Sequence, residues 1–91
     1  MGLTELRKSI DSIDEEISRL FKQRMELVAE VAKYKKENEI PILNSARERE
    51  ILEKVSSEMG EPFDKYGRTL FETLLDVSRA YQEACIAADG E

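Results

Sequence analysis

The sequence predicts an all-α protein of three helices, one long, one short and one of medium length. Two observations predict this class: good helix formers dominate the chain, and apolar residues recur at alternating steps of three and four. Pro41 and the pair Gly60 and Pro62 mark the boundaries between the three segments. A chain of 91 residues has room for one domain, which we expect to span residues 1–91.

The first helix is expected over residues 3–38. Its apolar stripe consists of Leu3, Leu6, Ile10, Ile13, Ile17, Leu20, Leu27, Val31 and Tyr34. At about 1.5 Å per residue this helix would be ~50 Å long, whereas a compact globule of this size is roughly 30 Å across. Because the stripe extends beyond any monomeric fold, we expect a second copy of the chain to cover it in a homodimer.

The second helix is expected to begin at Asn44 or Ser45, either of which can cap it, and Ser45 begins an S-x-x-E capping-box pattern. This helix should end at Gly60. The third helix is expected to open around Pro62, which suits a first helical turn, and to fray over residues 87–91. Its apolar face is formed by Phe63, Tyr66, Leu70, Phe71, Leu74, Val77, Tyr81 and Cys85.

The composition excludes several kinds of chemistry. The chain has no histidine, no cysteine cluster and no glycine-rich phosphate loop, so any activity must use arginine, lysine, carboxylates and amides, and we expect no metal and no cofactor. A net charge of −6 argues against nucleic acid or an anionic membrane as the partner. A single cysteine and the lack of a membrane-length or signal-peptide-like apolar run indicate a cytoplasmic location.

One cation interrupts the apolar stripe. Arg24 lies between Leu20 and Leu27, where a buried charge costs several kcal/mol unless an anion meets it. Lys35 follows after about three turns on the same face, so both side chains can reach one small anion. Arg7 is ~25 Å from Arg24 along the helix and can serve that site only from the partner in an antiparallel dimer. A buried ion pair, or a side chain that extends to water, explains Arg24 equally well.

Four further polar residues accompany these cations. Arg47 and Glu48 fall in the first turn of the second helix, and Ser78 and Gln82 lie one turn apart on the third. Arg47 is unfavourable for the helix dipole there, which indicates another role. Glu48 has an ordinary explanation as a cap partner, and Ser78 and Gln82 could satisfy each other. With the cations of the first helix, the set describes a receptor for a small polyanion with a hydroxyl, able to catalyse only by positioning and charge stabilisation.

The order and spacing of these residues resemble the all-α chorismate mutases. The resemblance is carried by residues 6–14 (LRKSIDSID), Arg24, residues 31–35 (VAKYK), Pro41, residues 47–50 (RERE) and the segment 71–82 with Phe71, Ser78 and Gln82. It implies a chorismate mutase type II domain that forms an intertwined dimer of three-helix protomers, with two active sites each built from both chains. The implied reaction is the 3,3 (Claisen) rearrangement of chorismate to prephenate, which leads to phenylalanine and tyrosine.

The resemblance also implies which residues hold the two carboxylates of chorismate. These are Arg24, Arg47, Ser78 and, from the other protomer, Arg7. The rearrangement is unimolecular and needs no proton transfer, which suits a chain without histidine. Each site would therefore depend on the homodimer for one of its cations.

By the same resemblance, Lys35 and Gln82 would meet the ether oxygen, where negative charge grows as the C–O bond breaks. We expect little loss of activity between about pH 6 and 8, because the Gln82 amide donates without needing a proton, unlike the glutamate of some relatives. Glu48 would accept from the ring hydroxyl, helped by the backbone at Asn44. Relatives frequently carry aspartate in place of Asn44, and both residues cap a helix about equally well.

Three other interpretations stay open. An isochorismate pyruvate-lyase shares the fold, although lyase relatives tend to lack the carboxylate of Glu48. A non-catalytic helical dimerisation or regulatory module explains the stripe, but neither Arg24 within it nor Lys35 in line with Arg24. The chain could also be the mutase part of a larger enzyme, or be controlled by a partner protein; we expect a free-standing enzyme because the sequence begins and ends close to the helical core.

Overall fold

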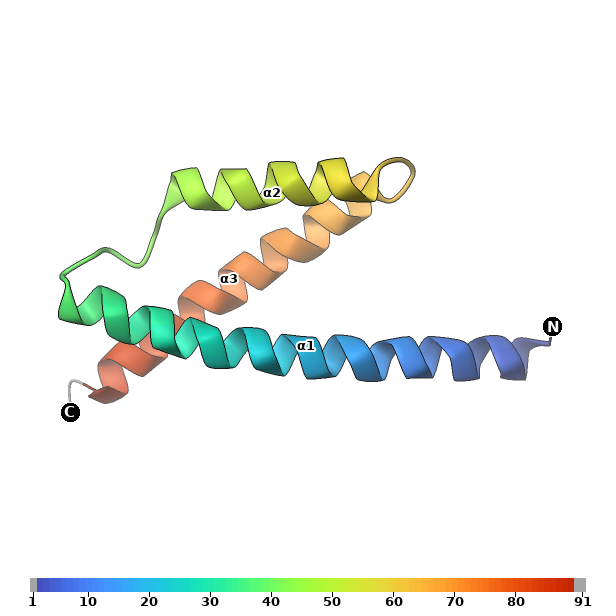
Figure 1. Ribbon diagram of the computed structural model, residues 1–91, viewed down its shortest axis with the longest axis horizontal. Helices are drawn as coiled ribbons and strands as arrows, with labels where there is room; N and C mark the ends of the chain where they lie inside the picture. The colour runs from blue at the N-terminus through green and yellow to red at the C-terminus, as the bar shows by residue number, and fades with distance from the viewer. Residues whose placement is uncertain (1, 90–91) are drawn as a thin grey trace.

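The computed structural model describes residues 2–89, which form three α-helices joined by two short loops (Figure 1). α1 is Leu3–Glu37, α2 is Ser45–Met59 and α3 is Asp64–Asp89. Residues 2–89 contain no strand, so the predicted all-α class is confirmed. No helix within this range is long and apolar enough to span a membrane.

The protein is elongated because α1 extends well past its partners. The molecule measures 53 × 27 × 14 Å with a radius of gyration of 16.4 Å, against about 12 Å for a compact chain of this length. α3 crosses the C-terminal half of α1 and leaves the N-terminal half uncovered (Figure 1). On that half Ile10, Ile13 and Ile17 keep 55%, 60% and 55% of their surface exposed. The overhang from which we predicted a dimer is therefore present, and the dimer itself stays a prediction.

α3 is the central element, because it packs against both α1 and α2 (Figure 1). The described apolar residues that become buried are few, one from each helix: Ala32, Val55 and Leu75. A single chain of this size buries too little apolar surface for more than marginal stability. The small core thus leaves much of the apolar face of α1 available for another contact.

The ends of α2 depend on two residues with suitable local chemistry. Asn44 is the N-cap, and its side-chain oxygen accepts a hydrogen bond from the backbone N–H of Arg47 at 3.0 Å. The capping box expected from Ser45 is therefore wrong, since Ser45 is already the first helical residue. At the other end Gly60 has φ 64°, a left-handed conformation that glycine adopts without steric cost. The predicted stop at Gly60 is confirmed.

Replacing Asn44 by alanine should lower the free energy of unfolding by about 1 kcal/mol, because the N–H of Arg47 loses its acceptor. Asn44→Asp should change it by less than about 0.5 kcal/mol, since a carboxylate oxygen accepts the same bond. Urea unfolding followed by circular dichroism, at one fixed protein concentration, measures both variants. An alanine variant as stable as the parent would show that the cap contributes nothing.

Two expectations about α3 need correction. Residues 61–63 form a turn and the helix begins at Asp64, two residues after Pro62. The turn is closed by hydrogen bonds from the N–H groups of Phe63 and Asp64 to the carbonyl of Gly60, at 3.0 and 2.9 Å. The tail was expected to fray over residues 87–91, but residues 87–89 continue the helix, whereas 90 and 91 lie outside the described range.

Candidate active site

The three helices and the loop before α2 surround a cavity of about 200 Å³. Seven of the eight residues predicted to contact substrate line it: Arg24, Lys35, Asn44, Arg47, Glu48, Ser78 and Gln82. Arg79 and five apolar side chains complete the walls. Four cationic side chains and one carboxylate thus face one cavity in a chain whose net charge is −6. This local excess of positive charge suits a small molecule that carries more than one negative charge.

Arg24 crosses from α1 to α3. Its guanidinium Nη1 donates a hydrogen bond to the hydroxyl of Ser78, which in turn donates to the carbonyl of Leu74 at 2.7 Å. Burial lowers the pKa of Arg24 from its ordinary value, because desolvation disfavours the charged form. No carboxylate in residues 2–89 pairs with Arg24, so the ion-pair interpretation finds no support among these residues. A partly desolvated cation whose partner is a neutral hydroxyl is prepared to bind an anion.

Lys35 is held by the loop between α1 and α2. Its ammonium Nζ donates to the carbonyl of Ile42 at 2.7 Å, and the side chain is half-buried. An ammonium has three donors, so this bond orients Lys35 without neutralising its charge. Lys35 and Arg24 lie ~16 Å apart along the axis of α1. Their long side chains nevertheless line the same cavity, as their positions on one face of the helix predicted.

Gln82 supplies a buried amide to the same cavity. It is 7% exposed, and its side-chain oxygen Oε1 has no hydrogen-bond partner among the described residues. A buried polar atom without a partner costs free energy, and it is uncommon unless a ligand or water completes its bonding. The oxygen and nitrogen of the amide exchange places by rotation of the terminal torsion. Gln82 can therefore present either an acceptor or a donor to a bound molecule.

Glu48 has a partner that the sequence reasoning missed. Its Oε2 lies 3.2 Å from Nε of Arg79 on α3, so its carboxylate is engaged across the helix interface and not at the helix cap. Arg79 follows Ser78 directly, and a residue one step away on a helix points about 100° to the side. That position resembles any charged residue on a solvated face. Only the crossing of α2 and α3 identifies Arg79 as part of the cavity.

Arg47 lines the cavity but its guanidinium is paired with Glu50, and Arg7 lies outside the cavity. Arg47 directs Nη1 to Glu50 at 2.5 Å, and its side chain is 60% exposed. An exposed pair of this kind is worth little, so a buried anion can recruit Arg47 at small cost. Arg7 is exposed on the N-terminal half of α1 and does not line the cavity. One chain therefore brings together seven of the eight predicted residues, and their roles stay predictions.

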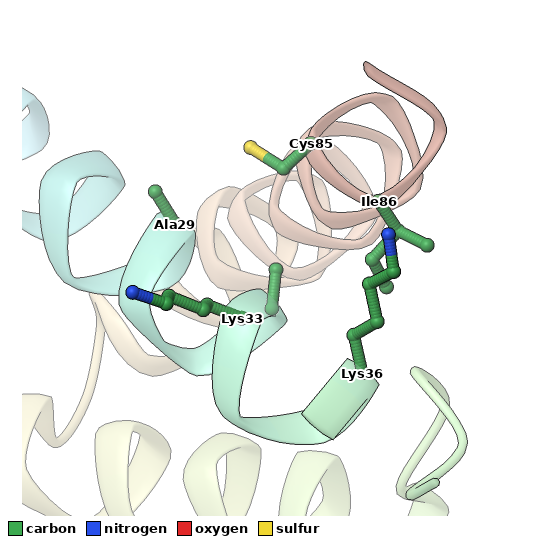
Figure 2. Close-up of a pocket in the computed structure, with 6 residues that line it drawn as sticks. Ala29, Lys33, Lys36, Cys85 and Ile86 are labelled. Carbon is green, nitrogen blue, oxygen red and sulfur yellow. The ribbon is translucent and has the colours of Figure 1, made fainter. Parts of the chain in front are cut away.

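A second hollow of about 180 Å³ lies between α1 and the end of α3 (Figure 2). It is lined by Ala29, Ala32, Lys33, Lys36, Cys85 and Ile86. Cys85 is half-buried there, and its interaction with Tyr81 raises the pKa of that tyrosine. None of the predicted substrate residues lines this hollow, so the cationic cavity is the better candidate for an active site.

Comparison with known proteins identifies the family of this chain. Residues 6–83 match the family described as chorismate mutase type II. The chain is 38% identical over 87 residues to a bifunctional chorismate mutase/prephenate dehydratase of Aquifex aeolicus, covering 96% of this chain and 24% of that protein. It is 32% identical over 83 residues to a chorismate mutase of Methanocaldococcus jannaschii, covering 89% and 84%. The chain thus spans about a quarter of the bifunctional relative and most of the second, and it belongs to the chorismate mutase type II family.

Proposed function

We propose that this chain is a chorismate mutase, an isomerase that converts chorismate to prephenate in the biosynthesis of aromatic amino acids. The observation that carries the proposal is that the chain belongs to this family and has a cavity lined by four cationic side chains and one carboxylate. Chorismate is a dianion with a ring hydroxyl and an ether oxygen. The cavity offers cations for the carboxylates, Glu48 for the hydroxyl and donors for the ether. We treat residues 1–91 as the catalytic domain.

In the proposed mechanism the protein binds a compact conformer and stabilises the charge that develops. Arg24, Arg47 and Ser78 hold the carboxylates, so that the enolpyruvyl group lies over the ring. The ether C–O bond breaks as the new C–C bond forms, and electron density moves onto the ether oxygen. Lys35 and Gln82 donate to that oxygen from fixed positions, which stabilises the transition state more than the ground state.

We propose a homodimer in which Arg7 enters the partner's site. The support is the uncovered half of α1 and the separation of Arg7 from Arg24 in the same chain, ~25 Å along the helix. An apolar hollow of about 430 Å³, formed by residues of α1 and α3 beside Arg24, provides a surface on which a partner helix can pack. The free thiol of Cys85 suits a reducing, cytoplasmic location.

The test is a continuous absorbance assay of chorismate disappearance, with the products separated by chromatography. Saturable conversion to prephenate supports the proposal. Release of pyruvate would indicate a lyase of the same fold. No consumption of chorismate by a folded protein would contradict the enzyme and favour a binding or dimerisation module.

Mixing two inactive variants should restore activity if the sites are shared. In a dimer of one Arg7→Ala chain and one Arg24→Ala chain, one site keeps both arginines and the other loses both. With random pairing, half of the dimers are mixed and carry one working site of two, so we expect roughly a quarter of the parent activity. The chains are unfolded together, refolded and assayed, with each variant refolded alone as the control. No recovery in a mixture shown to contain mixed dimers would contradict the shared site.

A further inference from the structure

Arg79 and Glu48 form a partition between two hollows. Their atoms Nε and Oε2 lie 3.2 Å apart, and their side chains are 33% and 23% exposed. Both residues line the cationic cavity, and both also line a neighbouring hollow of about 310 Å³ on the outer side of α2 and α3. The pair therefore stands at the wall of the candidate site, with solvent-accessible space behind it.

Arg79 is anchored on its outer side by Asp76. Its Nη2 donates to a carboxylate oxygen of Asp76 one helical turn earlier, and the Asp76 side chain is 72% exposed. Nε is buried and makes no aligned hydrogen bond among the described residues, although Glu48 lies at ion-pair distance. The planar guanidinium carries five N–H donors, so Nη2 can donate to Asp76 while Nε faces Glu48.

Glu48 needs such a partner because the cavity contains competing cations. Arg24, Lys35 and Arg47 line the same cavity. A carboxylate free to turn toward one of them would neutralise a charge that the proposed reaction requires for the substrate. Arg79 has no proposed contact with substrate, so its pairing with Glu48 removes no cation from the receptor.

We propose that Arg79 is a positioning residue, which holds the carboxylate of Glu48 at the cavity wall as the acceptor for the substrate's ring hydroxyl and keeps it from pairing with the catalytic cations. This inference rests on the proposed function. One free oxygen of Glu48 remains for the hydroxyl while the other faces Arg79. The pair thereby contributes to recognition of a substrate that carries a hydroxyl.

The test is a double-mutant cycle between Arg79→Met and Glu48→Gln, measured as kcat/KM for chorismate. With Glu48 present, Arg79→Met should lower kcat/KM by about tenfold. In the Glu48→Gln background the same change should lower kcat/KM by less than about twofold, because the amide at position 48 needs no cation to hold it. Arg79→Lys should recover part of the loss. Arg68→Met is the matched control, since Arg68 lies on the same helix and lines only the outer hollow.

A second measurement separates positioning from a general loss of structure. A chorismate analogue without the ring hydroxyl should be converted less well than chorismate by the parent, and Arg79→Met should reduce this preference by about the same tenfold factor. Circular dichroism checks that each variant keeps its helices. If Arg79→Met lowered kcat/KM equally with Glu48 and with Glu48→Gln, or left the preference for chorismate over the analogue unchanged, the positioning role of Arg79 would be overturned. The proposed function would still stand. A folded parent that does not convert chorismate would overturn the proposed function, and this inference with it.

Discussion

Arg24→Ala is expected to lower kcat/KM by about 10²–10³-fold while the helical content stays unchanged. The guanidinium donates to Ser78 at the junction of α1 and α3 and has no carboxylate partner within residues 2–89. Removing it deletes a preorganised cation for the substrate, yet leaves no buried anion behind. Alanine is also a better helix former and less costly to bury on the apolar side of α1. The loss should therefore appear in catalysis and not in stability.

Steady-state kinetics and thermal unfolding of the same samples measure these two effects. Arg19→Ala is the matched control, because Arg19 lies on the same helix and pairs with Glu16 at the surface, with side chains 53% and 63% exposed. It should change activity by less than about twofold, as exposed pairs contribute little. Should Arg24→Ala unfold the protein at the assay temperature, the cation would be serving the structure, and the proposed role would be wrong.

Gln82→Glu is expected to make activity strongly dependent on pH. A protonated carboxyl can donate to the ether oxygen as the amide does, whereas an ionised carboxylate repels the negative charge that develops there. Gln82 is 7% exposed and shares its cavity with Arg24 and Lys35, so burial raises the pKa of a carboxyl introduced there, while the neighbouring cations lower it. Activity should therefore be highest at low pH and fall, by at least about tenfold, as the pH rises through that pKa.

A pH profile of kcat for the variant beside the parent measures this effect. The parent should stay nearly level between about pH 6 and 8, since an amide does not titrate in that range. Glu83→Gln, at an exposed position next in the chain, is the control and should follow the parent. If Gln82→Glu followed it as well, the side chain at position 82 would not be the donor to the ether oxygen.

The local errors in the helix boundaries have a physical explanation. Asn44 and Ser45 are both suitable caps, and only the observed hydrogen bond to the N–H of Arg47 distinguishes them. Pro62 is suited to a first helical turn, but the backbone first closes a turn onto the carbonyl of Gly60. Residue preferences restrict such positions to a few choices, and hydrogen bonding to neighbouring residues selects among them.

Within a single helix, the sequence by itself determined most of what matters for function. The periodicity of α1 places Arg24 and Lys35 on one face, because the geometry of an α-helix relates any two of its residues. The predicted length of the same helix exceeds the diameter of a compact globule of 91 residues, so we expected an overhang. The 53 Å extent of the molecule confirms it. The resemblance to a family added the expected roles of Glu48, Ser78 and Gln82.

Contacts between helices were decided only by the tertiary structure. The ion pair of Glu48 with Arg79, the bond from Arg24 to Ser78 and the unpartnered amide of Gln82 all depend on how α3 crosses α1 and α2. Sequence spacing carries no information on that crossing, because crossing angles depend on side-chain packing between elements far apart in the chain. Arg79 therefore looked like an ordinary surface charge until α2 was placed beside it.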